Sequence, residues 1–199
     1  TTSAVERILT GIEREREREI IARRFGLHDR KETLEQIGDL LGITRERVRQ
    51  LEKAILIRLK LAAEKDTDNV GAVEKHFIRH LHEMGGAARV SDLTKRIHTS
   101  PNERDHAHVA FIAELAPNLT VLGENDNYHH GVAIRERHDE KKLRGDVDSV
   151  VRTIKEHGQP ISVTDLHAKL SHEHPDQVRA IASLSKNLSS LKDQWGLNK

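Results

Sequence analysis

The spacing of apolar residues predicts that the first third of the chain is helical. Apolar side chains recur among alternating charges over residues 1–25, and Gly26 then favours the end of the helical segment. A second helix is predicted for residues 33–41, where four leucine or isoleucine side chains line one face. Gly42 interrupts this pattern, and a third helix is predicted for residues 44–60.

Two of these helices begin with residues that cap helix N-termini. Thr33 is followed three residues later by Gln36, which is the spacing of a capping box. Thr44 stands at the N-cap position of the third helix. Because the glycine-containing turn between the two helices is short, the helices must cross steeply, and the segment is predicted to form a helix-turn-helix.

The third helix separates apolar from charged side chains. Val48, Leu51, Ile55 and Leu59 form one stripe at spacings of three, four and four residues. The opposite face carries Glu46, Arg49, Gln50 and Lys53, with Arg45 on the flank of the first turn. In a helix-turn-helix, the N-terminal half of the second helix is the part that enters a DNA major groove.

These polar residue types suit contact with DNA. Arginine pairs bidentately with guanine, glutamine pairs with adenine, and glutamate accepts a hydrogen bond from cytosine. Arg47 and Lys53 are better placed for phosphates, which position a protein without reading sequence. The alternative is an ordinary solvated helix face held by pairs of opposite charge four residues apart.

An internal repeat occupies the remainder of the chain. The segments EMGGAARVSDLTKRI (83–97) and EHGQPISVTDLHAKL (156–170) align without gaps at an offset of 73 residues. Each copy predicts a helix, a glycine-containing turn, a short extended segment at a valine, and two further helices. The first copy continues into residues 119–134, two β-type runs around a Gly/Asn/Asp turn, which predict a hairpin. The second copy ends in DQWGLNK, so its hairpin is expected to be short.

Three helices followed by a hairpin is the plan of a winged helix. A polar hinge near residues 64–71 and a charge-dense linker at 135–146 separate the segments. The expected fold is therefore mostly α, with a helix-turn-helix module at 1–65 and tandem winged-helix modules at 72–136 and 146–199.

The charge of the chain is balanced overall but uneven along its length. The net charge is +1, whereas lysine plus arginine outnumber aspartate plus glutamate by 15 to 12 in residues 1–65 and by 10 to 7 in residues 141–199. The middle, residues 66–140, holds 8 basic and 13 acidic residues. Basic ends of this kind fit a modular protein with one or two polyanion-facing parts. Aromatic residues are only 3% of the chain, which argues against a base-stacking single-strand binder.

The stretch RFGL…TLEQIGDLLGITRERVRQLEKAILIRL closely resembles region 4 of sigma-70-type transcription initiation factors, over about residues 1–62. The resemblance implies binding to the −35 promoter element and contact with the flap of RNA polymerase. It also implies base-edge contacts by Arg45, Glu46 and Gln50, with Arg49 on bases or backbone. Phosphate contacts would come from Thr44, Arg47 and Lys53.

This chain departs from a complete sigma factor in two ways. The aromatic-rich region that melts the −10 element, which lies upstream of region 4 in the family, is absent here. About 135 residues follow the helix-turn-helix, where the family usually ends. The two repeats resemble the winged-helix module of the bacterial RNA polymerase delta subunit and of some chromatin and restriction proteins, which supports the fold more than a function.

Other kinds of site have little support in the sequence. There is no cysteine, no G-x-S-x-G, no P-loop and no G-x-G-x-x-G, so we expect no enzyme, no cofactor and no small-molecule substrate. His76 and His80 have the spacing of a shared metal ion, but no third ligand is convincingly placed, and no metal is expected. Without a membrane-spanning run or a signal peptide, the expected location is the cytoplasm.

The sequence therefore predicts a sequence-dependent double-stranded DNA-binding protein that acts in transcription without being a complete sigma factor. Docking to RNA polymerase is compatible with this prediction. Two alternatives stay open. The chain could be a protein-binding adaptor or RNA polymerase accessory factor, which its low net charge favours. It could also be the DNA-reading part of a larger restriction or modification enzyme, since the sequence begins TTSAV without methionine.

Overall fold

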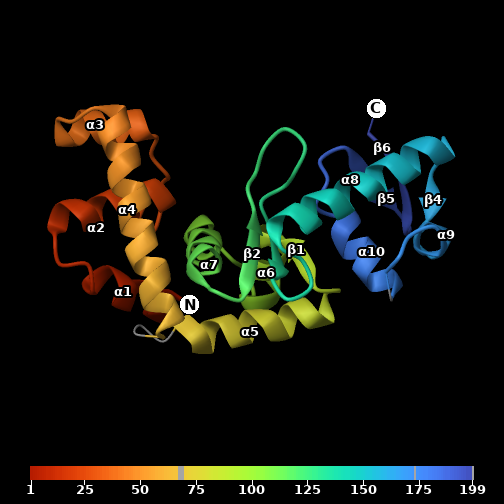
Figure 1. Cartoon of the computed structure of the whole chain (residues 1–199), viewed down its shortest axis with the longest axis horizontal. Coiled ribbons are helices and arrows are strands. Elements are labelled where there is room, and N and C mark those ends of the chain that lie inside the picture. Colours follow the sequence, from red (N-terminus) through yellow and green to blue (C-terminus); the bar gives the residue numbers. More distant parts are fainter. Residues whose placement is uncertain (67–69, 173, 199) are drawn as a thin grey trace. The chain divides into compact units, whose positions relative to one another are not determined.

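The computed structural model describes residues 1–66, 70–172 and 174–198 and is mostly helical, with small antiparallel sheets (Figure 1). Residues 67–69 of the predicted first hinge lie outside the described residues. The chain divides into two compact units: residues 1–75 with 98–117, and residues 76–97 with 118–199. Within the described ranges, no helix has the length and apolar character needed to cross a membrane.

The first unit contains five helices of the described chain and the start of a sixth. They are α1 (Thr2–Thr10), α2 (Glu15–Phe25), α3 (Leu34–Leu41), α4 (Arg45–Glu64) and α7 (Glu103–Leu115), with the first turns of α5 (Val70–Glu83). Helix α4 packs on α2 and α3, and α7 packs on α1 and α4.

Residues 1–25 form two helices, where a continuous helical segment was predicted. The chain turns at Gly11, and α2 begins after Arg14, which has an extended backbone. Arg18 stabilises this turn, because its guanidinium donates hydrogen bonds to the carbonyl oxygens of Leu9 (3.1 Å) and Ile12 (2.8 Å). An arginine thus satisfies carbonyl groups at the end of α1 that a longer helix would have satisfied internally. Gly26 ends α2 in the left-handed conformation, as predicted.

Helix α7 belongs to the core of the first unit, although the sequence repeat groups it with the segments that follow. Its side chains are buried on almost every side, and Phe111 packs against Phe25 with the ring centroids 5.0 Å apart. His108 lies with its Nε2 2.7 Å from the carbonyl oxygen of Leu27. The division into two units therefore follows different boundaries from the predicted three modules, and those modules stay a prediction about repeating segments.

The second unit contains two sheets with the same strand order. β1 (Ala87–Arg89), β2 (Leu119–Leu122) and β3 (Gly131–Ile134) form an antiparallel sheet in the order β1-β3-β2. β4 (Ile161–Ser162), β5 (Leu188–Leu191) and β6 (Gln194–Leu197) form another in the order β4-β6-β5. Both predicted hairpins are present, and the second closes tightly at Lys192 and Asp193, which both have positive φ.

The repeated segments also carry equivalent helices. α6 (Val90–Ile97) follows β1, and α9 (Val163–Ala168) follows β4; α8 (Glu140–His157) and α10 (Pro175–Ala182) complete the second copy. The valine predicted to be extended is instead the first residue of a helix in each copy. The reason is visible in the second copy, where the Ser162 side chain caps α9 by accepting a hydrogen bond from the Asp165 N–H at 3.1 Å.

Residues of both repeats share one hydrophobic core in the second unit. Ala87, Leu122 and Ala133 of the first sheet are buried together with Leu166, Ile181 and Trp195 of the second copy. The loop between β2 and β3 adds main-chain hydrogen bonds, from His129 N–H to the Leu184 carbonyl (2.9 Å) and from Lys186 N–H to the Asn127 carbonyl (2.8 Å). The two copies are therefore packed against each other within this unit.

Candidate nucleic-acid interface

Two glycines, Gly38 inside α3 and Gly42 directly after it, shape the turn between α3 and α4. Gly42 ends α3 with φ of 70°, and its N–H donates to the Gly38 carbonyl oxygen. The Ile43 N–H donates to the same oxygen at 2.9 Å. A Cβ at position 38 would lie 2.7 Å from the carbonyl oxygen of Ile43. The tight crossing of the helices thus depends on glycine at both positions.

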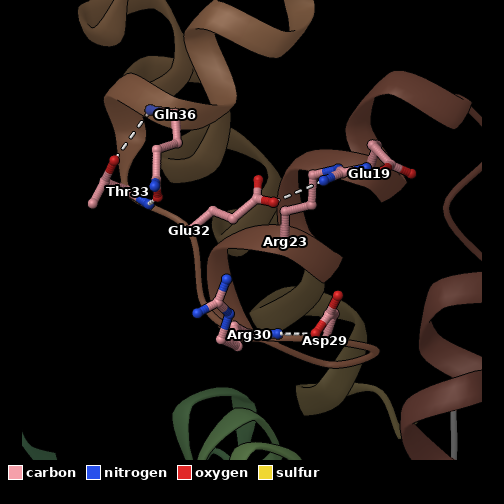
Figure 2. Close-up of polar contacts among 7 residues, drawn as sticks. All are labelled: Glu19, Arg23, Asp29, Arg30, Glu32, Thr33 and Gln36. Carbon is pink, nitrogen blue, oxygen red and sulfur yellow. Dashed lines mark hydrogen bonds and ion pairs between the residues drawn. The ribbon is translucent and has the colours of Figure 1, made fainter.

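Both helices of the motif begin with the predicted caps. Thr33 Oγ1 accepts from the Gln36 N–H at 3.1 Å, while Gln36 Oε1 accepts from the Thr33 N–H at 2.9 Å (Figure 2). Thr44 Oγ1 accepts from the Arg47 N–H at 3.1 Å. These bonds fix where each helix starts, which sets the side chains that the first turns present.

Helix α4 buries one side and exposes the other, in the predicted arrangement. Val48 and Ile55 are buried, and Leu51 and Leu59 are half-buried, so the apolar stripe faces the core. The residues predicted to contact DNA are all exposed: Thr44, Arg45, Glu46, Arg47, Arg49, Gln50 and Lys53. Exposure is a condition for contact with a ligand, while the role of each residue stays a prediction.

An ion pair dominates the electrostatics of this face. Arg49 donates to both carboxylate oxygens of Glu46, from Nε at 2.9 Å and from Nη2 at 2.6 Å. The hydrogen bond from Arg49 lowers the pKa of Glu46, with smaller contributions from Gln50 and Arg45. The same bond raises the pKa of Arg49. Both groups are therefore charged at neutral pH, and they meet through two hydrogen bonds on the exposed face.

Ion pairs to α2 hold α4 in place. Glu52, whose side chain is 16% exposed, lies 3.3 Å from Arg24 Nε. Glu17 accepts from Arg58 Nη2 at 2.7 Å. These pairs join polar positions on two helices that also share buried apolar side chains, so they orient α4 rather than supply much of the stability of the unit.

A hollow of about 250 Å³ lies before α3, lined by Asp29, Arg30, Lys31, Glu32 and Gln36. Figure 2 shows Glu32 directed toward Arg23, whose Nη1 donates to Glu32 Oε1 at 2.8 Å, and Asp29 beside Arg30. Arg30 and Lys31 are exposed and were not among the predicted contact residues. Two adjacent basic residues just before a capping box are the sequence signal that could have drawn attention to them.

The histidines form no metal cluster in the described ranges. His76 and His80 do lie together, with the rings edge to face and the centroids 4.7 Å apart. Nowhere in those ranges do three potential metal ligands come together.

The helix-turn-helix matches a known family. The model of that family, "Sigma-70, region 4", matches residues 14–61. This confirms the predicted resemblance for those residues, while residues 1–13 lie outside the match. The two repeats lie outside it as well, and their resemblance to winged helices stays a prediction.

Curated relatives agree with this assignment. RNA polymerase sigma factor SigA1 of Synechococcus elongatus is 42% identical over 65 residues, 32% of this chain and 15% of the relative. RNA polymerase principal sigma factor HrdC of Streptomyces coelicolor is 54% identical over 46 residues, 23% of this chain and 14% of the relative. RNA polymerase sigma factor RpoS of Coxiella burnetii is 47% identical over 57 residues, covering 28% and 16%.

The similarity is thus confined to a short segment of this chain and to a short segment of each relative. The chain spans about one seventh of the length of the SigA1 and HrdC relatives. No solved structure matches the chain. Residues 14–61 are similar to region 4 of Sigma-70 factors, a helix-turn-helix segment of proteins named RNA polymerase sigma factors.

Proposed function

We propose that this chain binds double-stranded DNA in a sequence-dependent way and acts in transcription, with α4 as the helix that enters the major groove. Arg45, Glu46, Arg49 and Gln50 read base edges. Thr44, Arg47 and Lys53 contact phosphates and fix the register of the helix. The function needs no catalytic step, cofactor or small-molecule substrate.

The observation that carries this proposal is the exposed polar face of a helix whose opposite face is fixed. The capped start of α4, the glycine turn before it and the ion pairs to α2 hold the helix. Its N-terminal turns present three arginines, the Glu46 carboxylate and the Gln50 amide, without large exposed apolar side chains. A rigid helix with such a face is what base readout requires. Similarity to sigma factors supports the same conclusion.

Arg30 and Lys31 extend the proposed interface toward α3. Both are exposed beside the hollow at the start of that helix. The first helix of a helix-turn-helix crosses the DNA backbone, so cations at its start would meet phosphates. Their contribution would be independent of base sequence.

The two repeats are proposed to be winged-helix modules at 72–136 and 146–199. The support is their order of elements, helix, strand, helix, helix and hairpin in both copies, together with the identical strand orders of the two sheets. By analogy with other helix-turn-helix motifs, the third helix of a winged helix is the one that usually contacts DNA bases. The equivalent helices here are α7 and α10.

Neither of these third helices offers a free basic face. Helix α7 is buried among α1 and α4. Helix α10 packs on α8, α9 and β1, and its Arg179 lies between two carboxylates, 2.6 Å from Asp193 and 2.5 Å from Asp176. The hydrogen bond from Arg179 lowers the pKa of Asp193, so both partners stay charged and neutralise each other. This argues against DNA readout by α7 and α10, and contact with protein, RNA polymerase among the partners, stays the second candidate function.

The proposal is tested by selecting random duplexes with the full chain and with an Arg45→Ala/Gln50→Ala variant. A matched control, Arg96→Ala/Gln159→Ala, removes the same residue types at exposed positions outside the helix-turn-helix. The wild type and the control should recover one shared motif. The α4 variant should recover a blurred motif, because each lost base contact costs about 1–3 kcal/mol.

The outcome decides between the candidate functions. A motif that survives in the α4 variant would exclude α4 as the reader. Failure of the wild type to enrich any motif would exclude sequence-dependent binding and leave the protein-binding adaptor as the function.

A further inference from the structure

We infer that the outer face of α8 is a second binding surface for the phosphate backbone of duplex DNA. Helix α8 is the long teal-to-blue helix of Figure 1. Its buried side carries Leu143, Val147, Val150 and Ile154. The opposite side carries what is called here the α8 stripe: Lys141, Arg144, Asp148, Arg152 and Lys155, at spacings of three, four, four and three residues.

The α8 stripe holds four cations and one carboxylate, all on exposed residues. The carboxylate, Asp148, accepts a hydrogen bond from the Tyr128 hydroxyl at 2.7 Å. Arg144 is paired with Glu140 at 2.6 Å, on the flank of the stripe. Lys141, Arg152 and Lys155 form no ion pair with any residue that the structure describes. Glu156 is the remaining acidic residue near this face.

The shape of the stripe suits a polyanion. Lys141 and Lys155 are separated by 14 residues, which is about 21 Å along a helix. Each strand of duplex DNA advances about 3.4 Å per phosphate, so the row can run beside several phosphates of one strand. Lysine and arginine on long flexible stems can follow such a row without exact registration.

The same face is poorly suited to a protein partner. Protein interfaces rely on buried apolar or aromatic anchors at their centre. The exposed large apolar side chains of the described chain are Leu40, Ile57, Leu61, Leu191 and Leu197. None of them lies on α8, so attraction here is electrostatic only. That is the character of sequence-independent DNA binding.

This inference takes its ligand, duplex DNA, from the proposed function, but it does not depend on α4. It assigns DNA contact in the second repeat to the first helix of the copy, whereas the third helix, α10, has its arginine neutralised. A second contact on the same duplex would raise the affinity of the chain through effective concentration.

The test measures, by fluorescence anisotropy, the affinity of the full chain for a mixed-sequence duplex at a series of salt concentrations. The variant is Lys141→Gln/Arg152→Gln/Lys155→Gln. The control, Lys75→Gln/Lys95→Gln/Lys169→Gln, removes the same charge from exposed positions on α5, on α6 and directly after α9. The α8 variant should lower the slope of log affinity against log salt by about 1 per contact. The factor by which this variant binds the duplex more weakly than wild type should shrink about 40-fold between about 50 and 200 mM salt.

A further variant separates binding from a structural role. Asp148→Asn keeps an oxygen that can accept from Tyr128 but removes the negative charge, so affinity for the duplex should rise severalfold. An α8 variant that binds like the control would overturn the inference. So would unchanged duplex binding together with lost binding to a poly-glutamate peptide, which would point to an acidic protein partner.

The two claims fail separately. If Arg45→Ala/Gln50→Ala leaves sequence preference unchanged, the proposed role of α4 is wrong, yet the α8 variant should still lower the salt slope. If the α8 variant has no effect, the motif selected through α4 should still be recovered.

Discussion

At the scale of single residues, the pair Glu46–Arg49 sets the starting state of the proposed DNA-reading face. In the free protein the Nε and Nη2 groups of Arg49 both donate hydrogen bonds to the Glu46 carboxylate. Arg49 can therefore contact a guanine only by sharing or leaving its carboxylate partner, and Glu46 becomes free to accept from a cytosine only in the same event. The two residues act as one unit, so single substitutions at either position should not have additive effects on DNA binding.

Gly38 illustrates how a single backbone position determines the motif. Gly38→Ala should destabilise the first unit by about 1–3 kcal/mol, because the new Cβ would lie 2.7 Å from the Ile43 carbonyl oxygen. Gly145→Ala is the matched control on α8, where a Cβ would meet nothing within 4 Å. It should stabilise the chain by about 0.5–1 kcal/mol through helix propensity. Urea denaturation measures both, and equal effects would contradict the steric argument.

His138 should make stability depend on pH. It is 5% exposed, and burial lowers its pKa, although Asp146 at 2.9 Å opposes this shift. The folded state therefore binds the proton less readily than the unfolded state. The contribution of His138 to stability is complete above the unfolded pKa of about 6.5 and is lost as pH falls toward the lower folded value.

The measurement is the free energy of unfolding between about pH 7.5 and pH 5. His138→Gln should flatten the decline below pH 6.5, relative to wild type and to His157→Gln at an exposed position. Some decline in stability should remain, because burial also lowers the pKa of His129, and this likewise makes the folded state less stable as pH falls. A variant whose profile parallels that of wild type would contradict the assignment to His138.

At the scale of elements, α7 shows where a repeat in sequence and a folding unit differ. Phe111→Ala should lower the unfolding midpoint of the first unit by removing a fully buried ring, at a cost of about 3–5 kcal/mol. Trp195, the one tryptophan of the chain, lies in the core of the second unit and reports that unit by fluorescence. The Trp195 midpoint should therefore move little in this variant.

Leu166→Ala is the matched variant in the core that contains Trp195. It should lower the fluorescence midpoint, whereas Phe111→Ala should mainly change the helical signal seen by circular dichroism. If Phe111→Ala shifted both signals equally, α7 would not be specific to the first unit.

Much of this arrangement of elements could be predicted from the sequence, since its signals are local. The caps at Thr33 and Thr44, the glycine turn and the apolar stripe of α4 each follow from residue type and short spacing. The repeat at an offset of 73 residues predicted two equivalent sets of elements, which the two sheets display. Exposure of Arg45, Glu46, Arg49, Gln50 and Lys53 followed from the helical wheel alone.

Features that depend on distant contacts could not be predicted. The break between α1 and α2 is not such a feature, since the chain turns at Gly11 and the Arg18 guanidinium meets the carbonyl groups of Leu9 and Ile12 close by in sequence. The burial of α7 in the first unit depends on packing against helices about 50 to 100 residues earlier. The repeat signal instead grouped α7 with its own copy, because repeats report origin and local fold rather than which surfaces meet.

At the scale of the whole molecule, the chain combines α4, the proposed DNA-reading helix, with two repeats whose third helices offer no free basic face: α7 is buried, and the arginine of α10 is neutralised. Net charge is +1, so the proposed DNA affinity must come from local surfaces, α4 and α8, rather than from a general field. Sequence preference would come from α4, and the salt-dependent part of the affinity from both. Leu191 and Leu197 are exposed on the last hairpin, whose strand β6 packs on α8.

The proposed role of α4 is tested most directly by the affinities of the full chain for its selected duplex and for a shuffled duplex of the same composition, at physiological salt. The ratio of the two affinities should be about 10³ or more, as for other specific DNA-binding proteins, and should fall toward unity in Arg45→Ala/Gln50→Ala. A ratio near unity for the wild type would contradict the claim that this helix-turn-helix reads DNA sequence.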